Sequence, residues 1–402
     1  MLIVKKFGGS SVADKERIFN VANRVSEDYK AGHDVVVVLS AMGKTTDELI
    51  AKARDINPRA PKREMDMLLT CGEQMSVSLM AMALHRMGIP AVSLNAWQVA
   101  MHTSSAYSNA RLKRIDCDRI HAELDQRKIV IITGFQGINK YEDYTTLGRG
   151  GSDTTAVALA AVLKADACEI YTDVEGVYTA DPRIVPNARK LKEITYDEML
   201  ELAALGAKVL HHRSVEIAKK YGVQLVVRSS LNTAEGTIVK EETKMEKMLV
   251  SGVAADKNCA RVAVVGLKDE PGMAFKLFNL MSRNNINVDI ILQSIGREGT
   301  KDITFTVAKE NADDVSAVLK ENENRFHYKS FSIKPDVAKV SIVGAGMMSN
   351  PGVAAKMFEA LYDKGINIKM ISTSEIKISV LIELENADDA VRSIHDKFGL
   401  ED

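Results

Sequence analysis

Thr145-Thr-Leu-Gly-Arg-Gly-Gly-Ser-Asp153 runs directly into an apolar helical pattern at 154–165. Its three glycines let the backbone come close to a ligand, and the first N–H groups of the following helix point towards that ligand. Arg149 adds a planar fork that suits a carboxylate or a phosphate, whereas Asp153 places a negative charge beside it. An anion-binding turn that also holds a carboxylate indicates catalysis rather than simple anion capture.

Strand-like and helical patterns alternate on both sides of this turn, over the first 245 residues. The alternation predicts an α/β fold with a mainly parallel sheet sandwiched between helices. Because ligands of such sheets bind beyond the carboxyl ends of the strands, we expect Gly8-Gly9, Ser40, Gly134 and Thr172-Asp173 to lie along one edge. The strand patterns are 2–4, 35–39, 91–94, 129–133, 168–172 and 225–227, and the helical patterns are 15–29, 64–87, 154–165 and 196–221.

An internal repeat follows a polar and charged stretch at 229–248. Pro271-Gly-Met-Ala-Phe-Lys-Leu-Phe278 matches Pro351-Gly-Val-Ala-Ala-Lys-Met-Phe358, and Ile286-Asn-Val288 matches Ile366-Asn-Ile368. Each copy reads as strand, Pro-Gly turn, helix, strand, strand, helix and strand, which is one supersecondary unit. We therefore expect three domains, at 1–245, 246–334 and 335–402.

Composition narrows the classes of function. The 402 residues include 53 basic and 54 acidic side chains, so no overall field favours nucleic acid or an anionic membrane. The cysteines at 71, 117, 168 and 259 have neither metal-site spacing nor the pattern of a disulfide framework. The N-terminus enters a strand pattern at once, and no apolar run is expected to reach the length of a membrane span. We therefore expect a cytoplasmic protein.

Five motifs occur in a fixed order along the chain. They are Val4-Lys-Lys-Phe-Gly-Gly-Ser-Ser11, Leu39-Ser-Ala-Met-Gly43, Gly72-Glu73, the block at 148–153 and Tyr171-Thr-Asp-Val-Glu-Gly-Val-Tyr-Thr-Ala-Asp-Pro-Arg183. In this order, and together with the tail repeats, they resemble the aspartate kinases of the amino-acid kinase family. The resemblance covers the whole chain. It implies an amino-acid kinase fold followed by two ferredoxin-like ACT domains of order βαββαβ.

The resemblance implies ATP-dependent phosphorylation of the side-chain carboxylate of L-aspartate to 4-phospho-L-aspartate. This reaction is the first step towards lysine, threonine and methionine. ATP would enter with Mg²⁺ held by its phosphates and by water, because no carboxylate cluster in the sequence reads as a metal cage. Since the attacking carboxylate is already ionised at neutral pH, no general base is required.

Phosphoryl transfer depends on cations and N–H donors placed around the moving group. The resemblance assigns Lys6 to the transition state and makes Asp153 the residue that holds Lys6 and Lys208 in register. Side chains alternate along a strand, so only one of Lys5 and Lys6 can point towards the site. Tyr178 suits either stacking on adenine or packing in the core. The implied ATP contacts are Lys6, Gly8, Gly9, Ser10, Thr172, Asp173, Tyr178, Asp181, Pro182, Arg183 and Lys208.

The substrate carries an ammonium and two carboxylates, so its pocket needs an acidic partner and a basic fork. Glu73 and Arg149 match those needs, and Gly72 indicates that a ligand comes close to the helix. Without the resemblance, Glu73 would read as a surface carboxylate and Arg149 as a structural salt-bridge residue. The implied aspartate contacts are Ser40, Thr46, Glu73, Arg149, Gly150, Gly151 and Ser152.

The ACT resemblance implies feedback inhibition by lysine, threonine or both. Alternatively, the repeats build only an interface between copies of the chain, and the two roles are compatible. A homo-oligomer is expected, and an internal start at Met245 or Met248 would yield a separate ACT-only subunit, as in some relatives. The implied effector contacts are Asp269, Met273, Ala274, Asn287, Val288, Asp289, Gln293, Asn350, Val353, Ala354, Asn367, Ile368, Thr373, Ser374 and Glu375.

Three other patterns have simpler interpretations. Lys44-Thr45 ends a string like a phosphate-binding loop, but Val38 stands where that loop needs glycine. His211-His212 with Glu216 lacks the spacing of helical zinc sites, so a structural role is expected. The methionines at 64–87 fit core packing better than a partner groove. Two other functions stay open, which are phosphorylation of glutamate or acetylglutamate and a catalytically silent amino-acid sensor.

Overall fold

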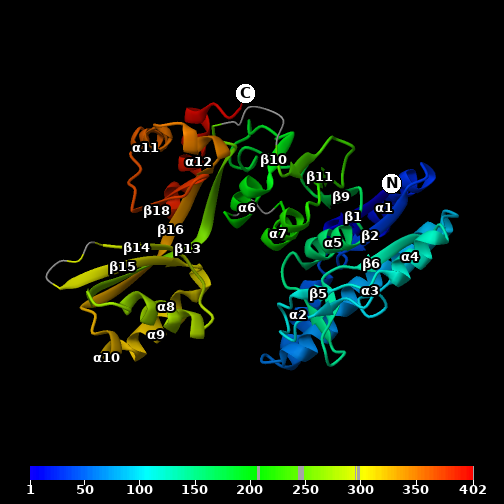
Figure 1. The fold of residues 1–402 in the computed structure, drawn as a ribbon, viewed down its shortest axis with the longest axis horizontal. Coiled ribbons are helices and arrows are strands. Elements are labelled where there is room, and N and C mark those ends of the chain that lie inside the picture. The colour runs from blue at the N-terminus through cyan, green and yellow to red at the C-terminus, as the bar shows by residue number, and fades with distance from the viewer. Residues whose placement is uncertain (206–208, 243–248, 295, 297–298, 402) are drawn as a thin grey trace. The chain divides into compact units, whose positions relative to one another are not determined.

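The computed structural model describes residues 1–205, 209–242, 249–294, 296 and 299–401. The chain forms two compact units (Figure 1). The first unit comprises Met1–Tyr178, Lys190–Ala204 and Lys208–Glu246, and the second comprises Thr179–Arg189, Leu205–Ala207 and Lys247–Asp402.

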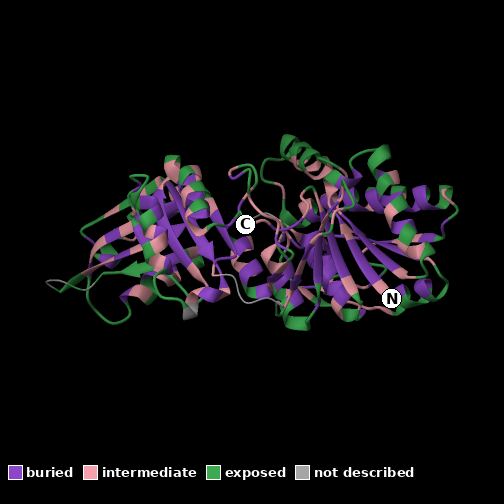
Figure 2. Cartoon of the chain, turned by 90° about the horizontal axis from the view of Figure 1, so that it is seen from above, coloured by how far each residue is buried: buried purple, intermediate pink, exposed green. Residues whose placement is uncertain are grey.

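An eight-stranded sheet forms the centre of the first unit, in the order β10-β12-β11-β9-β1-β2-β6-β3. Every neighbouring pair is parallel except β11 and β12, which confirms the predicted mainly parallel sheet. The Val and Ile runs of β2 and β6 are buried on both faces, as expected when helices cover both sides of a sheet (Figure 2). The strands are β1 (Leu2–Phe7), β2 (Asp34–Leu39), β3 (Ala91–Leu94), β6 (Ile129–Thr133), β9 (Ala167–Thr172), β10 (Glu193–Thr195), β11 (Leu225–Ser229) and β12 (Thr237–Lys240).

Helices pack against this sheet through small and apolar residues. Helices α1 and α3 share one core cluster with the sheet, in which Val37 and Met80 are fully buried. Helix α5 packs against β1 and α7, and its first ten residues are all buried. The helices are α1 (Lys15–Lys30), α2 (Thr45–Ile56), α3 (Lys62–Arg86), α4 (Asp118–Asp125), α5 (Gly151–Val162), α6 (Tyr196–Ala204) and α7 (His212–Tyr221), and a small second sheet contains β4 (His102–Thr103), β5 (Leu112–Arg114), β7 (Gln136–Ile138) and β8 (Tyr144–Thr146).

Two helical features differ from the sequence pattern. The single pattern at 196–221 forms two helices, α6 and α7, because His211 has an extended backbone (φ −82°, ψ 134°) where α7 begins. Helices α2 and α4 were not predicted; α2 has no buried residue, and α4 is only 8 residues long.

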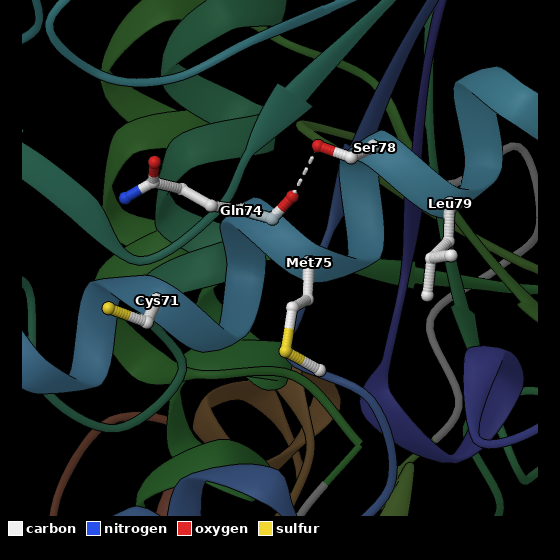
Figure 3. Close-up of a pocket in the computed structure, with 5 residues that line it drawn as sticks. All are labelled: Cys71, Gln74, Met75, Ser78 and Leu79. Carbon is white, nitrogen blue, oxygen red and sulfur yellow. Dashed lines mark hydrogen bonds between the residues drawn. The ribbon is translucent and has the colours of Figure 1, made fainter.

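Helix α3 is the one helix in the described residues that is long and apolar enough to span a membrane, contrary to the expectation that no apolar run reaches that length. However, 56% of its most apolar 18-residue stretch is buried, as in the core helix of a soluble protein. Its methionines occupy different environments, because Met80 is buried as predicted whereas Met67, Met75 and Met82 are exposed. Figure 3 shows Met75 between Cys71 and Leu79 along α3, where these three exposed side chains line one pocket.

A six-stranded antiparallel sheet forms the second unit, in the order β14-β15-β13-β16-β18-β17 (Figure 1). One core lies between this sheet and helices α8 and α9, and a second core involves α11 and α12. The two predicted βαββαβ repeats are thereby confirmed. The elements are β13 (Gly252–Lys268), α8 (Met273–Arg283), β14 (Val288–Gln293), β15 (Thr300–Val307), α9 (Ala312–Glu321), α10 (Glu323–Phe326), β16 (Ser330–Val343), α11 (Val353–Tyr362), β17 (Met370–Thr373), β18 (Lys377–Glu383) and α12 (Ala387–Phe398).

The two repeats interleave along the chain. The start of β13, from Gly252 to Asp256, pairs with the end of β16, the strand next to β18. The rest of β13, from Ala260 onwards, pairs with β15 of the first repeat. The start of β13 therefore completes the sheet of the second repeat, although it lies before the rest of the first repeat in the sequence. The expected domain boundary between residues 334 and 335 is kept as a proposal.

The segment Thr179–Arg189 packs within the second unit, although a first boundary near 245 was expected. Ala180 and Val185 are buried in the core that contains α12. The Thr179 hydroxyl forms a hydrogen bond of 2.9 Å with Nε2 of His395, which is fully buried in α12. Long-range packing, which no local sequence pattern reveals, places this segment in the second unit.

Candidate active site

Glycines let three segments of the first unit meet at the carboxyl edge of its sheet. A side chain at Gly9 would place its Cβ 2.5 Å from the Ala41 carbonyl oxygen. A side chain at Gly134 would place its Cβ 2.5 Å from Oγ of Ser152, at the start of α5. The Ser40 hydroxyl donates to Oγ of Ser152 at 2.9 Å, which joins the end of β2 to α5. The loops after β1, β2 and β6 therefore come together around the first turn of α5.

Lys6 on β1 pairs with Asp153 of α5, with 2.6 Å between Nζ and Oδ1. The two side chains are only 12% and 10% exposed. Lys5 points to the opposite face of β1, where its Nζ lies 2.5 Å from Asp28 and 2.7 Å from Glu169. Strand alternation thus separates the two lysines, and Asp153 holds the Lys6 ammonium at the edge of the sheet.

The glycine-rich turn leads into α5 through left-handed backbone. Gly148 has a φ of +79° and Gly150 a φ of +65°, which residues other than glycine rarely adopt. The Gly151 N–H donates to the Gly148 carbonyl at 3.0 Å and closes the turn. Arg149 is exposed between these glycines, next to the N–H groups that begin α5. The turn can therefore offer a guanidinium and helix N–H donors to one anionic ligand.

Glu73 of α3 is buried with one carboxylate oxygen unpaired. Oε1 accepts from the Ala41 N–H at 3.2 Å, and Oε2 has no hydrogen-bond partner among the residues that the structure describes. Burial raises the pKa of Glu73 to about 7, and smaller opposing contributions include those of the Ala41 N–H and of the nearby Gln136 amide. That amide makes its own hydrogen bond to the Thr70 carbonyl at 2.6 Å. A buried, half-paired carboxylate suits an incoming ammonium group.

Helix α3 reaches the site because Gly72 has no side chain. A Cβ at Gly72 would lie 2.8 Å from Cβ of Ala41 and 3.6 Å from Cγ2 of Thr45, at the start of α2. Thr46, the next residue, is half-buried in the first turn of α2. The predicted aspartate contacts thus come from β2, α2, α3 and the turn into α5, and the contacts above join these segments.

The predicted phosphate contacts follow two neighbouring strands. Gly8, Gly9 and Ser10 follow β1, and Thr172 ends β9, which pairs with β1. The Thr172 hydroxyl donates to Asp173 at 3.0 Å. These residues therefore flank Lys6 at the same edge of the sheet.

The other predicted nucleotide contacts divide between the units. Tyr178 is half-buried in the first unit, where its backbone pairs with Lys190. Asp181, Pro182 and Arg183 belong to the second unit, and the Arg183 guanidinium donates to the Asp181 carboxylate at 2.6 Å. Lys208, the second predicted phosphate lysine, lies outside the described residues.

Asp66 is a buried carboxylate that the sequence analysis did not single out. It accepts from the N–H groups of Ser108 and Thr146, both at 2.8 Å, and from the Thr146 hydroxyl at 2.9 Å. Burial raises the pKa of Asp66, and these hydrogen bonds oppose the rise. Because Thr146 leads into the glycine-rich turn, Asp66 anchors that turn to α3. The sequence spacing could have indicated Asp66. It lies two helical turns before Glu73, on the same buried side of an apolar helix.

Comparisons with known proteins assign the chain to a family. The family model described as Amino acid kinase family matches residues 1–229, and ACT domain models match 261–324 and 340–398. An aspartokinase from Bacillus sp. (strain MGA3) is 54% identical over 400 residues, which cover 99% of this chain and 97% of that protein. The chain belongs to the aspartokinases of the amino acid kinase family.

Further aspartokinases match over the same length. Aspartokinase 2 of Bacillus subtilis (strain 168) is 52% identical over 400 residues, covering 99% of this chain and 98% of that protein. The crystal structure of E. coli aspartokinase III in complex with aspartate and ADP, in the R-state, has a TM-score of 0.85 at 26% identity. The T-state structure of that enzyme in complex with lysine and aspartate has a TM-score of 0.75 at 26% identity. Both cover 99% of each chain, which confirms the predicted aspartokinase fold with two ACT domains.

The first ACT domain contains a cavity at the turn before α8. The cavity measures about 480 Å³, and its lining includes Asp269, Met273, Ala274 and Lys301. Oδ1 of Asp269 lies 3.0 Å from Nζ of Lys301. Three of the predicted effector residues therefore line one cavity that contains both an acidic and a basic group.

The other predicted effector residues lie at corresponding places in the two ACT domains. Gly272 and Gly352, with φ of +85° and +93°, cap α8 and α11 in the same conformation. Asp289 on β14 forms an ion pair with Lys339 of β16. Asn287, Val288 and Gln293 lie at or before β14, Asn350, Val353 and Ala354 lie around the start of α11, and Asn367, Ile368, Thr373, Ser374 and Glu375 lie along and beside β17.

Proposed function

We propose that the chain transfers the γ-phosphoryl group of ATP to the side-chain carboxylate of L-aspartate and forms 4-phospho-L-aspartate. One observation carries the proposal, which is the mostly buried Lys6–Asp153 pair at the sheet edge where Glu73 keeps an unpaired oxygen in the described structure. The relatives named aspartokinase, more than half identical over nearly the whole chain, support this substrate. The reaction opens the biosynthesis of lysine, threonine and methionine.

Each charge of the amino acid has a counterpart in the first unit. The Glu73 carboxylate receives the substrate ammonium, and Arg149 receives the α-carboxylate, which leaves the side-chain carboxylate free to attack. That carboxylate is ionised at neutral pH, so the transfer needs no general base. One of its oxygens bonds to the γ-phosphorus while the bond to the β,γ-bridging oxygen breaks, and ADP leaves with that electron pair.

Lys6 and the start of α5 stabilise the charge of the transferred group. Their ammonium and N–H donors act in a mostly buried site, where electrostatic interactions are stronger than in water. Asp153 is paired with Lys6, so the ion of MgATP would be held by phosphate oxygens and water and would neutralise part of the triphosphate charge. The nucleotide contacts proposed within the first unit are Lys6, Gly8, Gly9, Ser10, Thr172, Asp173 and Tyr178.

The ACT domains bind lysine, threonine or both as end-product inhibitors. The cavity beside Asp269 and Lys301 offers both charges that an amino acid requires. An effector changes the rate only by binding one conformation of the enzyme more tightly than another. The chain acts in the cytoplasm as a homo-oligomer through its ACT domains. A start at Met245 or Met248, which lie outside the described residues, supplies a separate ACT-only subunit.

Trapping of the acyl phosphate with hydroxylamine tests this activity. The purified chain should form hydroxamate from ATP and aspartate, and about a hundredfold less from glutamate or acetylglutamate. Lys6→Ala should lower kcat by about 10²–10³-fold, which is the usual loss when one charge-stabilising donor is removed. Lys44→Ala, which removes the exposed lysine before α2, is the matched control and should keep full activity.

Two outcomes would contradict the proposal. A folded chain that binds amino acids but forms no hydroxamate would be the catalytically silent sensor. Loss of activity in Lys44→Ala together with full activity in Lys6→Ala would assign the phosphate to the loop at Lys44-Thr45 instead.

A further inference from the structure

The bend that begins α7 packs directly on the glycine-rich turn. His211 caps α7, and its carbonyl accepts from the Ser214 N–H at 2.9 Å. Its side chain fills the space beside Gly150, because a Cβ built there would lie 2.2 Å from both Cβ and Cγ of the histidine. Glycine is therefore required at 150 for two reasons, its φ of +65° and the imidazole that lies against its Cα.

Arg213, two residues later, binds the base of the same turn. Its guanidinium donates to the Leu147 carbonyl at 2.6 Å, to the Ala110 carbonyl at 2.9 Å and to the Asn109 side chain at 3.2 Å. Leu147 immediately precedes Gly148, and a Cβ at Gly148 would lie 3.3 Å from Oδ1 of Asn109. Arg213 therefore fastens the residue from which the turn starts to the segment on which the turn rests.

The turn has few constraints of its own. Three of the four residues at 148–151 are glycines, and the bond that closes the turn joins two of them. Glycine loses more conformational entropy on ordering than any other residue, so a turn rich in glycine depends on contacts from outside. His211 and Arg213 provide such contacts from a single bend.

We propose that His211 and Arg213 are positioning residues for the phosphorylation of aspartate. They hold Gly148–Gly150 in the conformation that presents Arg149 to the substrate and aligns the start of α5 with Lys6. The inference rests on the proposed function and goes beyond it, because both residues act through the turn rather than on the reacting atoms. It assigns the positioning role to His211 and not to the adjacent His212, because the His212 side chain is half-exposed and its Nδ1 lies 3.5 Å from Glu216.

The imidazole of His211 acts as a neutral, packed ring. Its Nδ1 is buried and has no hydrogen-bond partner within the described part of the chain. Burial lowers the pKa of His211, although the nearby Asp153 carboxylate opposes that effect. The other charged groups near the ring are Arg213, His212 and Glu216 of the α7 segment. An aromatic ring without nitrogen should therefore replace the imidazole, whereas a small side chain should not.

Steady-state kinetics of four variants test this role. His211→Ala should raise the KM for aspartate about tenfold with the KM for ATP within about twofold, because a small displacement of substrate-orienting groups has effects of at least that size. His211→Phe should recover most of the loss. Arg213→Lys, which keeps the charge but not the planar fork, should resemble His211→Ala. His212→Ala is the matched control and should behave as the wild type.

Any of three kinetic results would overturn the proposal. A purely structural role would raise both KM values equally, or would make His211→Phe as poor as His211→Ala. An unchanged KM for aspartate in His211→Ala would also overturn it.

Hydrogen exchange at residues 148–154 tests the positioning role without any turnover. His211→Ala and Arg213→Lys should accelerate exchange of these amides about tenfold at an unchanged thermal midpoint, whereas His212→Ala should not. Unaltered exchange would overturn the positioning role. If the wild type proved inactive on aspartate while the exchange results held, the proposed function would fail and the support of the turn by these two residues would stand.

Discussion

Replacing Glu73 with glutamine should change how the stability of the first unit depends on pH. Burial raises the pKa of this carboxyl group from 4.5 to about 7. An acid whose pKa is raised by folding destabilises the folded state at every pH at which the group is ionised in the unfolded chain. The loss of folding free energy therefore begins as the pH rises through 4.5 and is complete above pH 7. At about 1.4 kcal/mol per pKa unit, the cost is about 1 kcal/mol at pH 5 and about 3 kcal/mol at pH 8.

Glutamine does not titrate, so the variant avoids this cost. Its free energy of unfolding, relative to the wild type, should therefore increase by about 2 kcal/mol between pH 5 and pH 8. Urea unfolding followed by the fluorescence of Trp97 measures the difference, because this single tryptophan of the sequence belongs to the first unit. Glu48→Gln removes an exposed carboxylate of α2 and should show no such pH dependence. Parallel pH curves for Glu73→Gln and the wild type would refute the reasoning.

Aspartate should bind more weakly to the Glu73→Gln variant than to the wild type, and its binding should release fewer protons. The substrate ammonium lowers the pKa of Glu73, so binding at pH 7 should release about half a proton from the wild type and none from this position in the variant. Titration calorimetry in buffers of different ionisation enthalpy measures these protons. The variant should bind aspartate about tenfold or more weakly, because it loses a charge-assisted hydrogen bond. Equal proton release by both proteins would contradict a contact between Glu73 and the ammonium.

Three further substitutions test contacts elsewhere in the chain. Gly134→Ala should destabilise the first unit by about 1–3 kcal/mol in urea unfolding, because the new Cβ would overlap Ser152, and unchanged stability would show that α5 shifts without cost. Thr179→Val should cost the second unit about 1–3 kcal/mol by removing the hydrogen-bond partner of the buried His395, and an unchanged thermal transition would contradict this. Asp269→Asn should weaken inhibition by lysine about tenfold, and an unaltered inhibition constant would show that the effector binds elsewhere.

Local patterns in the sequence predicted the framework of the site. Runs of Val and Ile in β2 and β6 show strands that are buried on both faces, and from these a parallel sheet follows. Strand alternation requires that Lys5 and Lys6 point apart, and the ion pairs of the two lysines show that they do. The glycines of the turn mark the close approach of the backbone segments around α5.

Contacts between distant segments explain what the sequence did not reveal. The segment Thr179–Arg189 reads as part of the first domain, but its apolar residues are buried in the core of the second unit. The strand that completes the second repeat precedes the first repeat, so matching the repeats along the chain could not show it. His211 and Arg213 show no chemical motif, because their partners are a glycine Cα and carbonyl groups about 60–100 residues away.

Transfer of labelled oxygen tests most directly the central claim that the side-chain carboxylate of aspartate attacks ATP beside Lys6. Aspartate labelled with ¹⁸O in that carboxylate should give an acyl phosphate with ¹⁸O bound to phosphorus, visible as an isotope shift of its ³¹P resonance. Lys6→Ala should form this product about a hundredfold or more slowly, and Lys44→Ala at the rate of the wild type. A phosphorylated product without ¹⁸O on phosphorus, or undiminished formation by Lys6→Ala, would contradict the claim.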